Sequence, residues 1–514
     1  MTRTPWCWVA LAAVLTVAGT PAYDGRASAA GPPNIILVLT DDLDSASMAS
    51  LPGIRGLLAD PGVTFSQFFV SDSLCCPSRT SILCGQYNHN HHVLTNGPPD
   101  GGYDRFNDLG HEGATIGRWL HDAGYRTVLM GKYLNGYPGD NASTSIPPGW
   151  DEWYVPADGE PYTEFRYTMN ENGHLVDYGD RAADYMVDVL AAKAEEFIRA
   201  SAGSEQPFFM YVAPYAPHAP YIPAPRDIDA FIGVQAPRPP SFDEADVDDK
   251  PHWVRALPPL TPRQVEDIDR IFAMRLRAML SVQSLIGAIV DTLAAVGKLD
   301  DTYVFFTSDN GYHFGEHRLL PGKQTPYEED LRVPLLVRGP GVAAGTTLPH
   351  LVGNVDFAPT FLALAGLPIR DDLDGHSMAP LLGPAPPSPQ SWRQAYLLEH
   401  LEEPSRHHAS ENPERVHLGT LEPIDPQTRV FKTHWRLPAI PSFNGLRLTD
   451  MVYVEYETGE RELYDLSKDP WELTNIASTA SPDLLAHLAA WLAAMRACAG
   501  PGCRSTDLTA PASH

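Results

Sequence analysis

The segment NIILVLTDD, residues 34–42, joins a run of five apolar residues to two aspartates. A near-continuous apolar run of this kind is typical of a strand that is buried on both faces. Similar runs occur at residues 125–130, 208–212 and 303–307, and helical periodicity occurs at residues 182–199 and 264–296. Strands that alternate with helices predict an α/β fold, in which helices flank a mostly parallel sheet.

Each of the four apolar runs leads into residues that can carry chemistry. In chain order these are Asp41-Asp42, Gly131-Lys132, Pro217-His218 and Asp309-Asn310. Ligands of open α/β sheets bind outside the carboxyl ends of the strands, so we expect these side chains to converge. A solvated turn or a helix cap explains any one of these ends, but explains all four together less well. The oxygens of the two acidic segments suit a hard cation such as Ca²⁺ better than Zn²⁺.

Composition and charge exclude several classes of protein. The 514 residues are 43% hydrophobic and 20% charged, which is a globular composition. The formal net charge of −27 argues against binding to nucleic acid or to an anionic lipid surface. An anionic substrate would therefore need a local concentration of positive charge in a pocket.

Residues 1–29 have the pattern of a signal peptide. Arg3 precedes an apolar run, residues 6–19, that is too short to span a bilayer comfortably, and Ala27-Ser28-Ala29 is a small-residue cleavage site. We therefore expect a secreted, extracellular protein; a membrane anchor is the less favoured alternative. No later segment is expected to be apolar for long enough to span a membrane, so we expect no stable membrane insertion.

Cysteine usage predicts one disulfide. Cys498 and Cys503 flank a short turn, and a disulfide between them would pin the C-terminus in an oxidising environment. Without the signal peptide, Cys75, Cys76 and Cys84 remain, which is an odd number. Either one of these thiols is free, or one is consumed chemically.

Residues 75–79, CCPSR, form the densest motif of the chain. Pro77 suits the first turn of a helix. Cys75 would then lie at a helix N-terminus, where the helix dipole lowers the pKa of a thiol and attracts anions. Arg79 can reach back toward the same place. The alternative is a buried cysteine pair beside the start of a helix.

This motif matches the Cys-x-Pro-Ser-Arg signature of the type I, formylglycine-dependent sulfatases, so the chain resembles that family. The resemblance runs from about Pro33 to about Trp491 and includes Asp41-Asp42, Gly131-Lys132, Pro217-His218, residues 307–311, residues 321–323 and residues 463–466. Residues 85–93 and 131–135 are most similar to the N-acetylglucosamine-6-sulfatase subgroup.

The resemblance implies an alkaline-phosphatase-like architecture. A large mixed, mostly parallel sheet flanked by helices would form a catalytic domain at residues 30–385. A smaller C-terminal α+β subdomain with an antiparallel sheet would follow at residues 386–514.

The resemblance also implies a mechanism. A formylglycine-generating enzyme would convert Cys75 to formylglycine, whose hydrate attacks the sulfur of a sulfate ester. Ca²⁺, with Mg²⁺ as the alternative, would polarise a sulfate oxygen. Its ligands would be Asp41, Asp42, Asp309, Asn310 and the modified Cys75. Arg79 would orient the hydrate, Lys132, His218 and Lys323 would surround the sulfate, and either His218 or Lys323 would protonate the leaving oxygen.

The implied substrate is a sulfate ester: 6-O-sulfated glucosamine, a related sulfated glycan or an aryl sulfate. Its specificity would lie in loops at residues 96–107, 154–178 and 400–434, the last of which includes His407, His408, Arg415 and Arg429. The cluster His89, His91 and His92 either holds a separate metal or lies at the substrate mouth or in solvent. Leu134 occupies the position at which many sulfatases have a histidine that hydrogen-bonds the modified residue.

The sequence is also compatible with two other functions. A phosphonate or phosphate monoester hydrolase of the same superfold would act on an anion of similar shape, although two-zinc phosphatases need more histidines than these strand ends supply. A non-catalytic sulfated-glycan-binding protein could also keep the scaffold.

Overall fold

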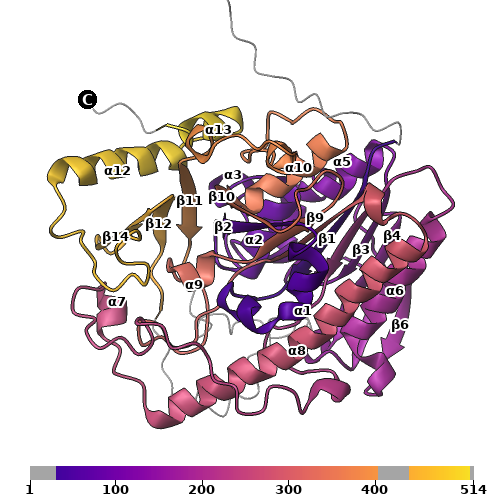
Figure 1. The fold of residues 1–514 in the computed structure, drawn as a ribbon, viewed down its shortest axis with the longest axis horizontal. Helices are drawn as coiled ribbons and strands as arrows, with labels where there is room; N and C mark the ends of the chain where they lie inside the picture. Colours follow the sequence, from indigo (N-terminus) through magenta and orange to yellow (C-terminus); the bar gives the residue numbers. More distant parts are fainter. Residues whose placement is uncertain (1–30, 140, 403–438, 510–514) are drawn as a thin grey trace, which may run out of the picture. The chain divides into compact units, whose positions relative to one another are not determined.

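A ten-stranded mixed sheet forms the centre of the fold (Figure 1). The computed structural model describes residues 31–139, 141–402 and 439–509. The strand order is β10-β2-β9-β8-β1-β7-β3-β4-β5-β6. The strands are β1 Asn34–Thr40, β2 Val63–Phe69, β3 Arg126–Gly131, β4 Glu152–Gly159, β5 Tyr167–Glu171, β6 His174–Tyr178, β7 Phe208–Ala213, β8 Thr302–Ser308, β9 Leu335–Arg338 and β10 Thr346–Gly353.

The central strand β1 shows why its sequence is continuously apolar. Ile35, Leu37 and Leu39 belong to one hydrophobic core, whereas Ile36 and Val38 belong to a second core. Successive side chains of a strand point to opposite faces, so a strand covered on both faces needs apolar residues throughout. β1 pairs in parallel with both β7 and β8, and β3 pairs in parallel with β7. The predicted mixed, mostly parallel sheet is confirmed.

Helices cover both faces of this sheet. The long helices α6 (Met186–Ser201) and α8 (Pro262–Ala295) run side by side on the face of the second core (Figure 1). α2 (Cys75–Cys84), α5 (Ile116–Asp122) and α10 (Phe357–Leu364) pack into the first core. The other α-helices among the described residues are α1 Pro52–Ile54, α3 Asn88–His91, α4 Gly102–Asp108, α7 His252–Arg255, α9 Glu328–Leu331, α12 Pro482–Arg496 and α13 Pro501–Thr506.

The composition of α8 corrects one expectation. α8 has 34 residues and contains an 18-residue window with a mean hydropathy of 1.6, so by length and composition alone it could cross a membrane. It is the one described helix that meets these criteria. More than half of that window, 56%, is buried inside the protein, where Leu285 and Ile289 are fully covered. The expectation that no later segment is apolar enough was wrong, because a long core helix reaches the same composition.

A separate antiparallel sheet lies in the C-terminal part of the chain. Its strands are β11 Ala395–His400, β12 Phe443–Leu448, β13 Met451–Tyr456 and β14 Arg461–Asp465, in that order. The predicted second, antiparallel sheet is thereby confirmed. The predicted signal peptide, and His407, His408, Arg415 and Arg429 of the third predicted loop, lie outside the described residues.

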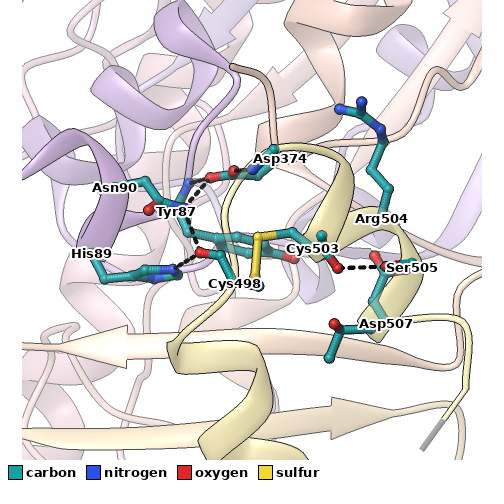
Figure 2. The surroundings of a disulfide bond; sticks show 12 residues. Tyr87, His89, Asn90, Asp374, Cys498, Cys503, Arg504, Ser505 and Asp507 are labelled. Atoms are coloured by element: carbon teal, nitrogen blue, oxygen red, sulfur yellow. Dashed lines mark hydrogen bonds between the residues drawn. A yellow bond between two sulfur atoms is a disulfide. The ribbon is translucent and has the colours of Figure 1, made fainter. Parts of the chain in front are cut away.

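A disulfide between Cys498 and Cys503 connects α12 to α13 (Figure 2). His89 contacts the carboxylate of Glu399 through Nδ1 at 2.8 Å and the carbonyl of Cys498 through Nε2 at 2.9 Å. His91, which is fully buried, contacts the hydroxyl of Ser81 at 3.0 Å. Two members of the histidine cluster therefore hold the helices and the C-terminal segment together.

Candidate active site

The carboxyl ends of four neighbouring strands supply one buried cluster of charged side chains. Asp41 and Asp42 follow β1, Lys132 follows β3, and Asp309 follows β8. His218 lies in the segment after β7. Because β8, β1, β7 and β3 are neighbours, their carboxyl ends open at one edge of the sheet. All five side chains lie in the interior, with Asp41 and Asp309 fully covered.

Helix α2 delivers Cys75 and Arg79 to the same edge. All ten of its residues are buried, and Cys75 is its first residue. The side-chain carbonyl of Asn96 accepts a hydrogen bond from the backbone N–H of Cys76 at 2.8 Å, which satisfies one free donor of the helix start. The hydroxyl of Ser78 donates to the backbone carbonyl of Asp309 at 2.5 Å and ties the helix to the end of β8.

The sulfur of Cys75 lies at the centre of the cluster. The ammonium group of Lys323 donates to Sγ at 2.7 Å, and the thiol donates to Oδ1 of Asp41 at 3.4 Å. Ligand atoms of Asp41, Asp42, Cys75 and His218 all lie within 4.8 Å of one another. The residue of the CCPSR motif and the residues at the strand ends thus meet at one point.

Each carboxylate of the cluster faces a cation. Lys132 Nζ donates to Asp41 Oδ2 at 2.7 Å, and Lys323 Nζ donates to Asp42 Oδ1 at 2.7 Å. Arg79 Nε donates to Asp309 Oδ2 at 2.8 Å. Buried charges are tolerated when they are paired and hydrogen-bonded in this way, so the cluster keeps three cations in the interior of an acidic protein, each balanced by one carboxylate.

The surroundings shift the pKa of these groups in opposite directions. Burial would raise the pKa of Asp41, but Lys132, His218 and Arg79 together hold it below its ordinary value. Burial and the neighbouring carboxylate of Asp41 raise the pKa of Asp309 to about 6. The crowded carboxylates therefore compete for the available positive charge.

The sequence predicts a lowered pKa for the Cys75 thiol, and the structure contradicts this prediction. Burial, and next to it the carboxylate of Asp41, raise the pKa of the Cys75 thiol well above its ordinary value. The start of α2 cannot offset this, because desolvation of a thiolate outweighs the partial charge of a helix terminus. This shift favours the neutral thiol of unmodified Cys75, which is a weaker nucleophile than a thiolate.

The donor atoms at this edge fit a hard divalent cation. Three buried carboxylates, from Asp41, Asp42 and Asp309, converge with the amide of Asn310. Among the described residues, Asn310 Oδ1 is buried without a hydrogen-bond partner, while its Nδ2 donates to Asp42 Oδ1 at 2.7 Å. Rotation of this amide by half a turn would face Oδ1 toward Asp42 and complete an all-oxygen set of the kind that Ca²⁺ and Mg²⁺ prefer.

A model of the sulfatase family matches residues 33–367. The chain belongs to the sulfatase family. N-acetylglucosamine-6-sulfatase of Homo sapiens is 35% identical over 518 aligned residues, which cover 99% of this chain and 92% of the human protein.

Two solved structures place this sulfatase among known folds. One, described as a complex with its substrate D-glucosamine-2-N,6-O-disulfate, matches with a TM-score of 0.72 and 23% identity, and the match covers 93% of this chain and 99% of that chain. A phosphonate monoester hydrolase of Agrobacterium radiobacter matches with a TM-score of 0.60 and 23% identity, and the match covers 87% of this chain and 92% of that chain. At these identities the matches show the fold, which sulfatases share with other hydrolases of anionic esters.

This sulfatase has further residues beside the cluster that do not belong to any of the sequence motifs. The rings of Tyr162 and Tyr215 flank Lys132, with Nζ 5.1 Å and 6.0 Å from the ring centres. Arg275 of α8 is buried, donates to the backbone carbonyl of Asp42, and stacks on the ring of Tyr312 at 4.1 Å. Arg275 is the one charged residue on the buried face of α8, and a charge among the apolar positions of that face was the signal that could have identified it.

Leu134, which the resemblance places where many sulfatases have a histidine, is a buried apolar side chain. It lines a small pocket beside Lys132 together with Asn135, Tyr162 and Tyr215. Asn135 donates to the hydroxyl of Tyr162 at 3.4 Å. Both ring nitrogens of His313 are engaged, by Asp330 at 3.0 Å and by the carbonyl of Leu320 at 2.8 Å, so His313 does not supply the missing contact.

Proposed function

We propose that this sulfatase hydrolyses the 6-O-sulfate ester of glucosamine-containing glycans through a formylglycine made from Cys75. The observation that carries the proposal is the position of Cys75, whose sulfur is 2.7 Å from Lys323 Nζ and 3.4 Å from Asp41 Oδ1. The near full-length similarity to a protein named N-acetylglucosamine-6-sulfatase supports the choice of sugar.

Formylglycine and a divalent cation would supply the chemistry that a neutral thiol lacks. Formylglycine contributes a hydrated aldehyde as the nucleophile and a route for releasing the sulfate. The cation, which we propose to be Ca²⁺ or alternatively Mg²⁺, contributes Lewis-acid polarisation of a sulfate oxygen. Asp41, Asp42, Asp309, Asn310 and the modified residue 75 would hold it.

Lys132 and Lys323 would stabilise the negative charge that grows on the sulfate oxygens. Burial opposes the charge on Lys132, but Asp41 keeps its pKa well above the ordinary value, so its ammonium group stays protonated. A fixed cation in a site that excludes water stabilises a transition state more strongly than one in solvent. Tyr162 and Tyr215 would keep the ammonium group of Lys132 in place.

Arg79 would orient the reactive group at residue 75. Its Nε donates to Asp309 and its Nη1 donates to the backbone carbonyl of Lys132 at 2.9 Å, so the guanidinium plane is locked. Within the described chain, Nη2 is buried without a hydrogen-bond partner and lies 3.9 Å from Asp41 Oδ2. This donor is available to an oxygen on residue 75.

His218 and Lys323 are the two candidates for donating a proton to the leaving sugar oxygen. The Nδ1–H of His218 donates to the backbone carbonyl of Ala219 at 2.7 Å, so Nε2 is the nitrogen that faces Asp42, at 3.6 Å. The amine of Lys323 touches both Cys75 and Asp42. Lys323 can release a proton from its ammonium group, and His218 can release one from Nε2 when its ring is doubly protonated.

Maturation and location complete the proposal. A formylglycine-generating enzyme must act on residues 75–79 before folding, because every residue of α2 is buried afterwards. The N-terminal pattern at residues 1–29 supports secretion.

A panel of matched substrates tests the proposed function. We expect turnover of glucosamine 6-sulfate and nitrophenyl sulfate, and turnover at least 100-fold lower of nitrophenyl phosphate and a phosphonate monoester. Glucosamine with the sulfate at another ring position is the control for regiochemistry. Faster turnover of the phosphonate than of either sulfate would replace this proposal with the phosphonate hydrolase alternative.

A further inference from the structure

We propose a second divalent-cation site, formed by His317, Glu329 and Glu472. It is separate from the charged cluster around Cys75, which we call the catalytic cluster and which comprises Asp41, Asp42, Cys75, Arg79, Lys132, His218, Asp309, Asn310 and Lys323. Ligand atoms of these three residues lie within 4.8 Å of one another. His317 lies in the segment after β8, Glu329 lies on α9, and Glu472 follows β14. A cation there would join the segment that carries Lys323 to the C-terminal sheet. The proposal is independent of which ester the enzyme hydrolyses.

Each of the three residues has a buried atom that lacks a partner. In the described part of the chain, His317 Nε2, Glu329 Oε2 and Glu472 Oε1 are shielded from solvent and form no hydrogen bond. His317 itself is fully buried, and Glu472 is 1% exposed. Buried polar groups are almost always satisfied in native proteins, so three unsatisfied groups at one place indicate a missing ligand.

The other ring nitrogen of His317, Nδ1, contacts a carboxylate, as the non-ligating nitrogen of a metal-bound histidine commonly does. Nδ1 contacts Oε2 of Glu244 at 2.6 Å, and the Lys250 ammonium group donates to the other oxygen of Glu244 at 3.1 Å. A carboxylate beside Nδ1 fixes the proton on that nitrogen. The lone pair of His317 is then on Nε2, the nitrogen without a partner.

The two glutamates have no directly paired cation in the part of the chain that the structure describes, and Arg447 acts on Glu472 only through space. Across the described residues, neither Glu329 nor Glu472 forms an ion pair. Lys250 is used by Glu244, and Arg447 donates to Glu328 at 2.6 Å. Glu472 is oriented, because its Oε2 accepts a hydrogen bond from the backbone N–H of Glu328 at 3.0 Å and leaves Oε1 unpaired.

The donor set selects the kind of cation. One imidazole and two carboxylates suit Zn²⁺ and other first-row divalent metals, whereas the all-oxygen catalytic set suits Ca²⁺ or Mg²⁺. Tetrahedral ligands that lie about 2.1 Å from Zn²⁺ are about 3.4 Å apart, so modest side-chain movements would close the site. A water molecule would complete the coordination.

Zn²⁺ titration and elemental analysis of the purified full chain test this site. We expect one equivalent of Zn²⁺ per chain, bound in addition to the catalytic cation, and a rise of several degrees in Tm with Zn²⁺. His317→Gln and Glu472→Gln should each lose this equivalent. His350→Gln should keep it, because His350 is also buried with an unpartnered ring nitrogen but lies outside the described metal clusters.

Two further measurements separate the alternatives. Asp309→Asn, a change in the catalytic cluster, should keep the Zn²⁺ equivalent, and loss of Zn²⁺ in that variant alone would assign it to the catalytic site and overturn the proposal. Co²⁺ added to the unmodified protein should give visible d–d absorption, which tests the site even if a variant fails to fold. Absence of both Zn²⁺ uptake and Co²⁺ absorption would show that the two glutamates share protons instead.

Discussion

Two buried ion-pair networks of this sulfatase differ in how completely their atoms are satisfied. Arg393 donates to both oxygens of Asp356 at 2.7 Å and to Asp507 at 2.6 Å, and His376 contacts the same Asp507 at 2.9 Å. We call this set the Arg393 network. In the described chain, the catalytic cluster instead leaves Asn310 Oδ1 and Arg79 Nη2 without hydrogen-bond partners.

This difference indicates that the Arg393 network stabilises the fold, whereas the catalytic cluster binds ligands and takes part in the reaction. A network whose donors and acceptors are paired has no further ligand to bind and contributes rigidity. A cluster with buried groups left unpaired pays a desolvation cost that a cation or substrate can offset. Substitutions in the catalytic cluster should therefore affect turnover, whereas substitutions in the Arg393 network should affect folding.

Removal of the reactive side chain should have the largest effect. Cys75→Ala should abolish measurable turnover and leave the Tm within a few degrees of the original, because the smaller side chain still fits at the start of α2. Sulfate-ester assays and thermal unfolding check this. Cys84→Ala, which removes a buried thiol from the other end of the same helix, is the matched control and should keep turnover. Equal activity of the two variants would contradict the role of Cys75.

Loss of one carboxylate from the proposed cation ligands should have the second-largest effect on turnover. Asp309→Asn should lower kcat by several orders of magnitude, since it removes a proposed ligand charge and also the anionic partner of Arg79. Elemental analysis should show a matching loss of the hard cation. Asp300→Asn, an exposed residue in the short turn that precedes β8, should change neither quantity.

Removal of one lysine should lower turnover less than loss of a cation ligand does. Lys132→Ala and Lys323→Ala should each lower kcat by about 10²–10³-fold, the usual loss for one electrostatic contact to a transition state. Binding of a desulfated sugar should be unchanged, because neither lysine would contact its ring. Lys468→Ala, on the surface, is the control. Normal turnover by Lys323→Ala would remove this lysine from the site.

The Arg393 network should show the smallest effect on turnover and a clear effect on stability. Asp507→Asn should destabilise the fold by about 3 kcal/mol near neutral pH, because Arg393 keeps a buried charge with fewer partners. Burial would raise the pKa of Asp507, but Arg393 and His376 hold it below its ordinary value.

The direction of the Asp507 pKa shift determines how the free energy of unfolding depends on pH. A carboxyl whose folded-state pKa is lowered contributes stability above its unfolded pKa of about 3.9, and that contribution disappears as the pH falls through the folded value. Urea unfolding should therefore show a large difference between Asp507→Asn and the original at about pH 7 and a shrinking difference below about pH 4. A constant difference across this range would show that the Asp507 charge is not what stabilises the network.

The strand ends could be predicted because local patterns determine them. Five apolar residues before Asp41-Asp42 identify a buried strand, and the rule that ligands bind at carboxyl ends then places the acids. The position of Lys323 beside Cys75 came from the resemblance alone, because residue 323 lies in a segment with no strand or helix pattern of its own.

The remaining features depend on contacts distant in sequence. The pKa of Cys75 was predicted with the wrong sign, since the helix position is local but the burial by surrounding strands is not. Tyr162 and Tyr215 meet Lys132 only after β3, β4 and β7 assemble. Glu472 joins His317 and Glu329 from a segment that is far from them in the sequence, so no sequence spacing predicts this cluster.

The central claim is that residue 75 of the active enzyme is formylglycine. Peptide mass mapping of purified, active protein tests it most directly, on the tryptic peptide that contains residue 75. We predict a mass lowered by the exchange of sulfur for oxygen and the loss of two hydrogens, in a fraction of the protein that tracks specific activity across preparations. Full activity in a preparation that contains only unmodified cysteine at position 75 would contradict the account.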